Sequence, residues 1–409
     1  MIKSIGHFLF VFLYFANIGF VFFPGKLRTK LIIGICGILF FFFHNRGYKI
    51  LVDYIKPLIP LFLWMLLSFA TNQTGDYWFL QYSILQIPYL LGGIMIAQVC
   101  GFNKIEDLAK IIVAYVLFQN TIAFAGLISP SIMTFIQSLE KESIFNTHTH
   151  LLSYRAIGFG DHYFFGGGIW SAIGMLFLTF LYKKDIINTF LFYILFGYIF
   201  LTGLYLARTA VVGLIALAAL FIPLKRNWYK LLGLVIVAYI GFIALGFLQN
   251  FLYNLGVDVG YAFELYNNFS STGSLETSSS DKTAEMWNVI PNNIKTWIIG
   301  DARYIDPKDP TAYYMHTDVG FLRVIWYGGL VGLFFYLRQL YKYCILIINR
   351  YGKKSELSYT LILYFILTMI CLWKGLYDTS CVLYLFLGVC YNQRKYLSDK
   401  RIIKIDKGI

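Results

Sequence analysis

Long apolar segments separated by short polar connections repeat along almost the whole chain. A helix needs about 20 mostly apolar residues to cross the hydrocarbon core of a bilayer. Twelve segments reach or approach that length, near residues 5–23, 29–44, 56–71, 79–100, 108–128, 164–182, 187–206, 209–224, 230–248, 318–338, 357–374 and 379–391. The pattern predicts an all-α polytopic membrane protein with about twelve transmembrane helices, built as a single integral membrane domain over residues 1–409. The first segment could also serve as a signal peptide, but no small-residue cleavage site follows it, so we expect an uncleaved span.

Basic residues orient these segments, because cytoplasmic loops of membrane proteins carry an excess of lysine and arginine. They follow the sixth, eighth and tenth segments and fill the tail at about 392–409: Lys183, Lys184, Lys225, Arg226, Lys230, Arg338, Lys342, Arg350, Lys353, Lys354, Arg394, Lys395, Lys400, Arg401, Lys404 and Lys407. Twelve helices then place both termini in the cytoplasm. One hairpin disagrees, because Lys26, Arg28 and Lys30 fall outside. Either that hairpin does not fully cross, or the rule fails there.

Two long loops fall outside in this arrangement, at about 129–163 and 249–317. The second loop is acidic, which suits an exported segment, and its Ser/Thr-rich part at 270–280 is typical of a flexible linker. Further along, 283–299 carries apolar residues at helical spacing around Pro291. This spacing predicts a broken amphipathic helix that lies on the membrane surface.

Composition agrees with a membrane protein and excludes a soluble domain. Hydrophobic residues make up 58% of the chain and charged residues 13%, and the mean hydropathy is +0.65. A soluble domain needs about a quarter of its residues charged. The net charge of +13 does not indicate nucleic-acid binding, because the basic residues lie in short loops. The six cysteines lie in or beside apolar segments without a CxxC pair, which favours buried apolar side chains over disulfides or zinc.

Charged residues at the predicted outer membrane face are the candidates for chemistry, since an ionised group near hydrocarbon is costly and is usually kept for a function. Arg155, Asp161 and His162 precede the sixth segment and a glycine run at 166–168. Arg155 would hold an anionic group while Asp161 or His162 assists. Alternatively, it reaches lipid phosphates while the glycines pack helices. Arg208 stands alone in a short turn, where its planar guanidinium matches phosphate oxygens or caps the preceding helix.

A third cluster opens the tenth segment and holds His316, Asp318 and Arg323. It combines a candidate base, a carboxylate and an arginine over a short stretch. Alternatively, Asp318 is the N-cap of the helix, a role that is compatible with catalysis. The acidic stretch 306–309 has no partner cluster, so it predicts a loop turn and no metal site. Walker, HExxH and GxSxG sequences do not occur.

These clusters fall in segments that resemble the O-antigen and capsule repeat-unit polymerases (the Wzy-like family), which are related to the O-antigen ligases. The run 318–332 is similar to the conserved span of that family, with an acidic residue, a Phe-Leu pair and a turn of small residues. The segment 155–158 and the turn 206–209 resemble its two arginine motifs. The segment 297–304 resembles the Gly-rich end of its large external loop. The likeness touches roughly the second half of the chain.

One departure from the ligases bears on the activity. They carry a His-Asn pair where this chain has Asp318-Val319, and His316 comes two residues earlier. The difference favours a polymerase and leaves open which side chain acts as the base.

The resemblance implies a GT-C-like membrane glycosyltransferase that joins undecaprenyl-diphosphate-linked oligosaccharides with inversion and without a metal or another cofactor. Fixed arginines can stabilise a diphosphate leaving group where a metal otherwise would. The site would face the outside of the bacterial cytoplasmic (inner) membrane, which is the periplasm where an outer membrane exists. The partners would be the lipid-linked donor and acceptor, membrane lipid, a chain-length regulator and a flippase, with no nucleic acid.

The resemblance also implies roles for individual residues. Asp318 is the first candidate for the base and His316 the second. Arg155 and Arg208 are the first candidates for binding the donor diphosphate, and Arg323 and Arg303 are the second. Asp161 and His162 would be supporting residues.

Three alternatives stay open. The chain could be a ligase that transfers finished polymer to a terminal acceptor, a flippase or other transporter of lipid-linked oligosaccharide, or a membrane sensor or scaffold. Transporters place charges near the bilayer midplane and often show repeated halves. Here the halves differ and the charges gather at one predicted face, which favours an enzyme.

Overall fold

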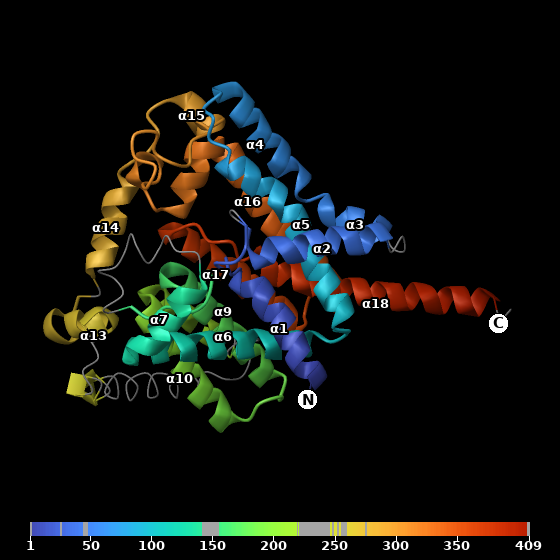
Figure 1. Cartoon of the computed structure of the whole chain (residues 1–409), viewed down its shortest axis with the longest axis horizontal. Helices are drawn as coiled ribbons and strands as arrows, with labels where there is room; N and C mark the ends of the chain where they lie inside the picture. Colours follow the sequence, from blue (N-terminus) through green and yellow to red (C-terminus); the bar gives the residue numbers. More distant parts are fainter. Residues whose placement is uncertain are drawn as a thin grey trace. The chain divides into compact units, whose positions relative to one another are not determined.

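The computed structural model describes residues 2–24, 27–43, 48–140, 155–218, 220, 246, 247, 249–251, 253, 254, 260–274 and 276–406 (Figure 1). In these residues every regular element is a helix, and the β pairing amounts to three isolated bridges. The chain divides into two compact units. The first unit comprises Met1–Asn17, Leu27–Ile111 and Thr283–Ile409, and the second comprises Ile18–Lys26 and Ile112–Lys282.

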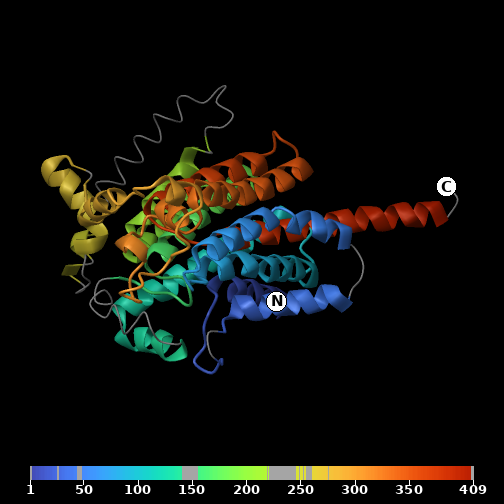
Figure 2. The same ribbon diagram turned by 90° about the horizontal axis from the view of Figure 1, so that it is seen from above.

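The first unit is a helical bundle with an irregular segment at one end. Its helices are α1 (Ile2–Ala16), α2 (Thr29–Phe43), α3 (Tyr48–Ile55), α4 (Ile59–Asn72), α5 (Trp78–Val99), α15 (Ile294–Ile298), η5 (Tyr314–His316), α16 (Gly320–Tyr351), α17 (Glu356–Lys374) and α18 (Ser380–Asp406). Figures 1 and 2 show the C-terminal part of α18 running past the other helices of this unit.

The second unit is also helical. Its helices are α7 (Pro130–Leu139), α9 (Phe164–Lys183), α10 (Thr189–Leu206), η2 (Arg208–Leu214), α11 (Ile215–Ala218) and α13 (Gly260–Thr272). Two helices contribute residues to both units: α6 (Ile105–Ile128) and α14 (Ser278–Trp287). The α9 helix lies at the centre of this unit, since it packs against α10, η2 and α11 and its residues 166–181 are buried.

Close backbone contact joins α2 and α5 in the first unit. A Cβ atom at Gly37 would lie 2.5 Å from the backbone nitrogen of Gly92, and one at Gly34 would lie 2.9 Å from the carbonyl carbon of Pro88. The two helices therefore pack this closely only because these positions lack side chains. Small residues at the contact are typical of helices that associate within a membrane.

Among the described residues, six helices are long and apolar enough to cross a membrane: Trp78–Val99, Ile105–Ile128, Phe164–Lys183, Thr189–Leu206, Gly320–Tyr351 and Glu356–Lys374. The pair α3 and α4, bent by 46°, would supply a seventh. These helices support an α-helical membrane protein. They are fewer than the twelve that the apolar pattern predicted.

The other predicted spans are shorter than expected or lie outside the described residues. Helices α1 and α2 have 15 residues each, and α1 ends at Ala16, where Asn17 takes a left-handed backbone with φ of 52°. The segment 209–224 starts as the 3₁₀-helix η2 and continues into the four residues of α11. The apolar part of α18 is also short. Almost all of the segment 230–248 is outside the described residues.

The two long loops contain more helix than the sequence suggested. The first includes α7, and the second includes α13, α14 and α15. The stretch expected to be flexible begins with the last turn of α13, where the hydroxyls of Ser271 and Thr272 donate to backbone carbonyls one turn earlier. The predicted amphipathic helix is broken around Pro291, as expected, but Met286 and Trp287 pack against the start of α16. Protein contacts therefore cover part of the face that was expected to meet lipid.

A buried ion pair explains part of the conflict over the first hairpin. The Lys30 side chain is 6% exposed, and its Nζ lies 3.8 Å from a carboxylate oxygen of Asp378, which precedes α18. Its charge is therefore balanced inside the first unit, so Lys30 does not count as a loop lysine. The cysteine prediction needs one correction: five cysteines are buried and none of the six forms a disulfide in the described structure, but Cys36 is exposed.

Candidate functional site

A break in α16 organises the candidate site of the first unit. Gly329 has φ of 68° and ψ of −173°, which interrupts the helix. The neighbouring carbonyls of Trp326 and Tyr327 accept the N–H groups of Asp301 and Ala302 at 2.7 and 3.0 Å. The segment after α15 therefore docks on the break and satisfies backbone groups that the helix leaves without partners. Two segments singled out in the sequence, 297–304 and 318–332, come together in this way.

Helix α4 supports the same break from another direction. The hydroxyl of Ser68 donates to the carbonyl of Tyr327 at 2.7 Å, and the indole N–H of Trp64 donates to the carbonyl of Gly328 at 2.6 Å. These bonds fix the first part of α16, which carries Arg323.

Gly300→Ala is expected to lower the thermal midpoint of unfolding more than Gly75→Ala. Both glycines have positive φ, so each substitution carries a backbone cost of about 1–2 kcal/mol. Only at Gly300 would the new Cβ also meet backbone, 2.3 Å from the carbonyl oxygen of Tyr327, whereas nothing lies within 4 Å at Gly75. Thermal unfolding of the two purified variants in detergent measures the difference. Equal shifts would contradict the docking of 300–302 on α16.

Asp76 holds the next part of the segment. Its Oδ2 accepts the backbone N–H groups of Tyr304 and Ile305 at 2.6 and 2.9 Å, and its Oδ1 accepts that of Trp78 at 3.0 Å. The Tyr327 hydroxyl donates to the Asp76 carbonyl at 2.8 Å. Asp76 is not among the residues predicted from the sequence. Its only signal there is a lone carboxylate in the short connection before α5.

Arg323 is buried between two tyrosines. Its guanidinium carbon lies 3.5 Å from the ring centroid of Tyr313 and 4.3 Å from that of Tyr304, and the residue is 7% exposed. An isolated β-bridge between Ile305 and Tyr313 brings the backbone of Tyr304 beside that of Tyr313. Stacking on aromatic faces contributes about 0.5–2 kcal/mol, which offsets only part of the cost of burying a charge.

No acidic side chain balances Arg323 among the residues that the structure describes. Within that described part of the chain, the Arg323 guanidinium makes no ion pair and no hydrogen bond, and its Nε is buried without a hydrogen-bond partner. Buried charges in proteins are ordinarily paired. Its positive charge therefore suits the binding of an anionic ligand.

The other candidates of this cluster lie on the loop before α16. His316 is 71% exposed, and its Nε2 lies 3.6 Å from a carboxylate oxygen of Asp306. In the described residues, no third His, Cys, Asp or Glu joins this pair to form a metal site. Asp318 is exposed, and the alternative that it caps the helix is wrong, because α16 begins at Gly320 and its N-cap residue is Val319. The helix starts later than expected, so Asp318 is not on it.

Tyr313 links Asp318 to Arg323. Partial burial raises the pKa of the Tyr313 hydroxyl, and the nearby negative charge of Asp318 raises it further. The same ring stacks on the Arg323 guanidinium. Arg303 is half-buried. Burial and the negative charge of Asp301 raise the pKa of Tyr314, and the positive charge of Arg303 lowers it. The structure thus groups Asp318, Arg323 and Arg303 around one irregular segment.

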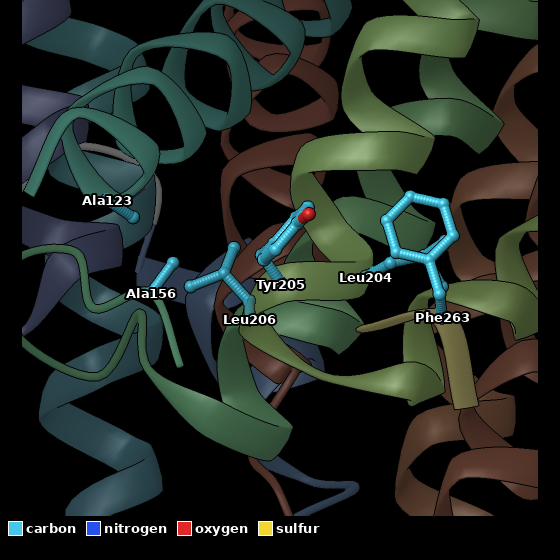
Figure 3. Close-up of a cluster of buried hydrophobic side chains, with 6 residues drawn as sticks. All are labelled: Ala123, Ala156, Leu204, Tyr205, Leu206 and Phe263. Atoms are coloured by element: carbon cyan, nitrogen blue, oxygen red, sulfur yellow. The ribbon is translucent and has the colours of Figure 1, made fainter. Parts of the chain in front are cut away.

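The first two arginine clusters meet in the second unit. The backbone N–H of Ala156 donates to the carbonyl of Tyr205 at 3.0 Å, and Tyr205 comes three residues before Arg208 in the sequence. This bond brings Arg155 to the end of α10. Figure 3 shows Ala156 beside Leu206 and Tyr205 in one buried apolar cluster. Arg155 is half-buried, with its guanidinium carbon 5.2 Å from the Phe164 ring centroid.

His162 is enclosed in this unit and Asp161 is half-buried beside it. Asn120 donates its amide hydrogens to Ser171 and Thr202, so its oxygen is the acceptor, and His162 Nε2 must donate to it at 2.8 Å. Burial lowers the pKa of His162 to about 3. The ring is therefore neutral at physiological pH and holds the turn to α6, which favours a packing role over proton transfer.

His162 should make the stability of the protein sensitive to acid. An unfolded histidine has a pKa near 6.5, above the folded value, so the unfolded state binds more protons between these values. The free energy of unfolding should therefore fall as the pH falls through this window, by up to roughly 1.4 kcal/mol per pH unit. In His162→Gln, which can still donate to Asn120, denaturant unfolding from pH 7 to 4 should show a weaker dependence. An unchanged dependence would refute this origin.

Arg208 is 7% exposed and forms an ion pair with Glu264 of α13. Ser278 completes the group: its N–H donates to Glu264 Oε1 at 2.7 Å, and its hydroxyl lies 3.2 Å from Oε2. Partial burial raises the pKa of Glu264, but the Ser278 N–H and the Arg208 charge outweigh it and hold that pKa below its ordinary value. The sequence placed Glu264 only among the acidic residues of a long loop, so this pairing was missed.

These features define an α-helical membrane protein with two separate arginine-centred polar clusters, one in each compact unit. Comparison with protein-family models, with curated proteins and with solved structures finds no match for this chain.

Proposed function

We propose that this protein polymerises undecaprenyl-diphosphate-linked oligosaccharide repeat units into O-antigen or capsular polysaccharide. In this proposal it is a multi-pass glycosyltransferase of the bacterial cytoplasmic membrane, with about twelve spans in a GT-C-like arrangement. Both termini lie in the cytoplasm and the reacting groups lie on the external face. The resemblance of 318–332 and the arginine motifs to Wzy-like polymerases supports it.

The observation that carries the proposal is the burial of Arg323 without an acidic partner in the described residues. Retaining such a charge costs several kcal/mol. A protein that binds an anionic group at this place recovers the cost. A lipid-linked diphosphate presents such a group at the membrane surface, and the planar guanidinium matches its oxygens.

The reaction would be an inverting displacement. A hydroxyl oxygen of the acceptor repeat unit attacks the anomeric carbon of the donor chain, and the bond from that carbon to the diphosphate oxygen breaks. The lipid diphosphate leaves with the electron pair. Asp318, or His316 as the second candidate, accepts the hydroxyl proton. Arg323 and Arg303 of the first unit stabilise the growing negative charge of the leaving group. Arg155 and Arg208 of the second unit are assigned separately, to the binding of a lipid-linked diphosphate.

Transport is the alternative from another class. The buried pair of Lys30 and Asp378 is the kind of charge that transporters use inside a membrane. Lys30 lies in the first turn of α2, and Asp378 lies just before α18. The two charges are paired with each other, so the pair fits a structural role better.

The test is electrophoresis of the surface polysaccharide from a deletion strain, compared with the same strain complemented in trans. A polymerase requires the long ladder to collapse to a single repeat unit on its anchor. If long polymer accumulates on undecaprenyl diphosphate and none reaches the anchor, the protein is a ligase. If the ladder is normal, both glycosyl-transfer functions are refuted.

A further inference from the structure

Three donors surround the carboxylate of Glu264 in the second unit. They are the guanidinium of Arg208, the backbone N–H of Ser278 and the hydroxyl of Ser278, which also lies 3.5 Å from the second terminal nitrogen of Arg208. A guanidinium with a backbone N–H and a hydroxyl is a donor set that proteins use to bind phosphate oxygens. The Glu264 carboxylate thus occupies a position with the chemistry of an oxyanion site.

The two partners of this pair differ in how firmly they are held. Arg208 is 7% exposed and follows the buried end of α10. Glu264 is three times more exposed, at 23%, and stands on α13, whose residues 269–272 are exposed. Figure 3 shows that the neighbouring Phe263 anchors α13 to the cluster at the end of α10. The carboxylate can therefore turn outward about its own side-chain bonds while Phe263 and Arg208 stay packed.

We infer that Glu264 is a displaceable counter-ion that sets the specificity of an anion site made by Arg208 and Ser278. With the site empty, the carboxylate neutralises Arg208. A ligand must then compete with a negative charge already in place. A singly charged phosphodiester, as in the headgroups of bulk phospholipid, gains little by the exchange. A diphosphate carries more charge and more oxygens, so it displaces Glu264. The choice of a diphosphate as the ligand rests on the proposed function.

The pKa of Glu264 agrees with this role. It lies below its ordinary value, so the competing charge is fully present at neutral pH. An ordinary structural ion pair would share this property, so the two roles must be separated by ligand binding.

The experiment is calorimetric titration of the purified full-length chain, in nanodiscs of zwitterionic lipid, with inorganic pyrophosphate. Glu264→Gln removes the competing charge and keeps the side-chain length and an oxygen that can accept the Ser278 N–H. It should bind pyrophosphate about tenfold more tightly than the unmodified chain. Dimethyl phosphate, a monoanionic probe, should begin to bind. Arg208→Gln should remove both effects. The matched control is Glu276→Gln, an exposed glutamate of the same loop, which should leave the affinity unchanged.

A second variant guards against misfolding of the first. Glu264→Asp keeps the charge but withdraws it by one methylene, so its affinity for pyrophosphate should fall between those of the unmodified chain and Glu264→Gln. If both variants melt normally and bind pyrophosphate no more tightly than the unmodified chain, the inference is refuted. Failure of the proposed polymerase function would show separately, as a normal ladder in the deletion strain with the pyrophosphate result unchanged.

Discussion

Arg323→Gln is expected to lower the rate of polymerisation by about 10²- to 10³-fold, because removal of one fixed donor to a developing oxyanion typically costs that much. The guanidinium is held by Tyr304 and Tyr313, so it is already oriented before substrate binds. Arg323→Lys keeps the charge but loses the planar stacking and the paired donors, so its rate should be intermediate. A reconstituted assay with a purified lipid-linked repeat unit, followed by the length of the products, measures these rates.

Stability gives a second readout for the same variants. If Arg323 serves a ligand, Arg323→Gln removes a buried charge that lacks an acidic partner in the described structure, so the thermal midpoint of the empty protein should stay the same or rise. A purely structural arginine would show the reverse, with a lower midpoint. The matched control is Arg350→Gln in the last turn of the same helix, which should leave both rate and midpoint unchanged. A full rate in Arg323→Gln would contradict the assignment.

The sequence located the long helices well. Helices α5, α6, α9, α10 and α17 lie close to predicted segments, because long apolar stretches must be buried or meet lipid. It failed where polar residues continue a helix or where the helix type changes. Helix α16 runs to Tyr351, beyond the predicted end at 338, since its later residues still bury Tyr343 and Ile347. The segment after Arg208 begins as a 3₁₀-helix, a difference that hydrophobicity alone does not report.

The sequence identified the arginines of the site but not what surrounds them. A lone charge in an apolar context is visible in one dimension, so Arg155, Arg208 and Arg323 could all be singled out. Their surroundings are not, because they depend on contacts between distant segments. Tyr304 and Tyr313 meet Arg323 through an irregular loop that a bridge and Asp76 hold in place, and neither follows a helical or strand period with it.

The same limit applies to Glu264 and Asp378. Glu264 is one acidic residue among several in its loop, and Asp378 is a lone carboxylate between two apolar segments. The importance of each comes from a cation that is distant in the sequence: 56 residues separate Glu264 from Arg208. The break at Gly329 could be predicted only in part from the sequence. The Gly-Gly pair was visible, but the docking of 300–302 against it follows from the positive φ of two glycines and their lack of side chains.

Asp318→Asn is expected to reduce polymerisation by about 10²- to 10⁴-fold, the usual contribution of a positioned base. The amide keeps the size of the side chain but cannot accept the acceptor hydroxyl proton. His316→Ala should have a much smaller effect, since His316 is 71% exposed and lies beside Asp306. Asp309→Asn is the matched control, because that carboxylate is bonded to Thr311 within its own turn.

Binding separates the base from the phosphate-binding arginine. Asp318→Asn should bind the lipid-linked diphosphate as the unmodified chain does and fail in the subsequent transfer, so single-turnover rates fall while the dissociation constant stays the same. Arg323→Gln should weaken binding and slow transfer together, because its charge meets the diphosphate both before and during bond breaking. If His316→Ala shows the large loss and Asp318→Asn does not, the base is His316. If neither variant is slowed, the proton leaves to another group, and the irregular segment before α16 serves only to position Arg323.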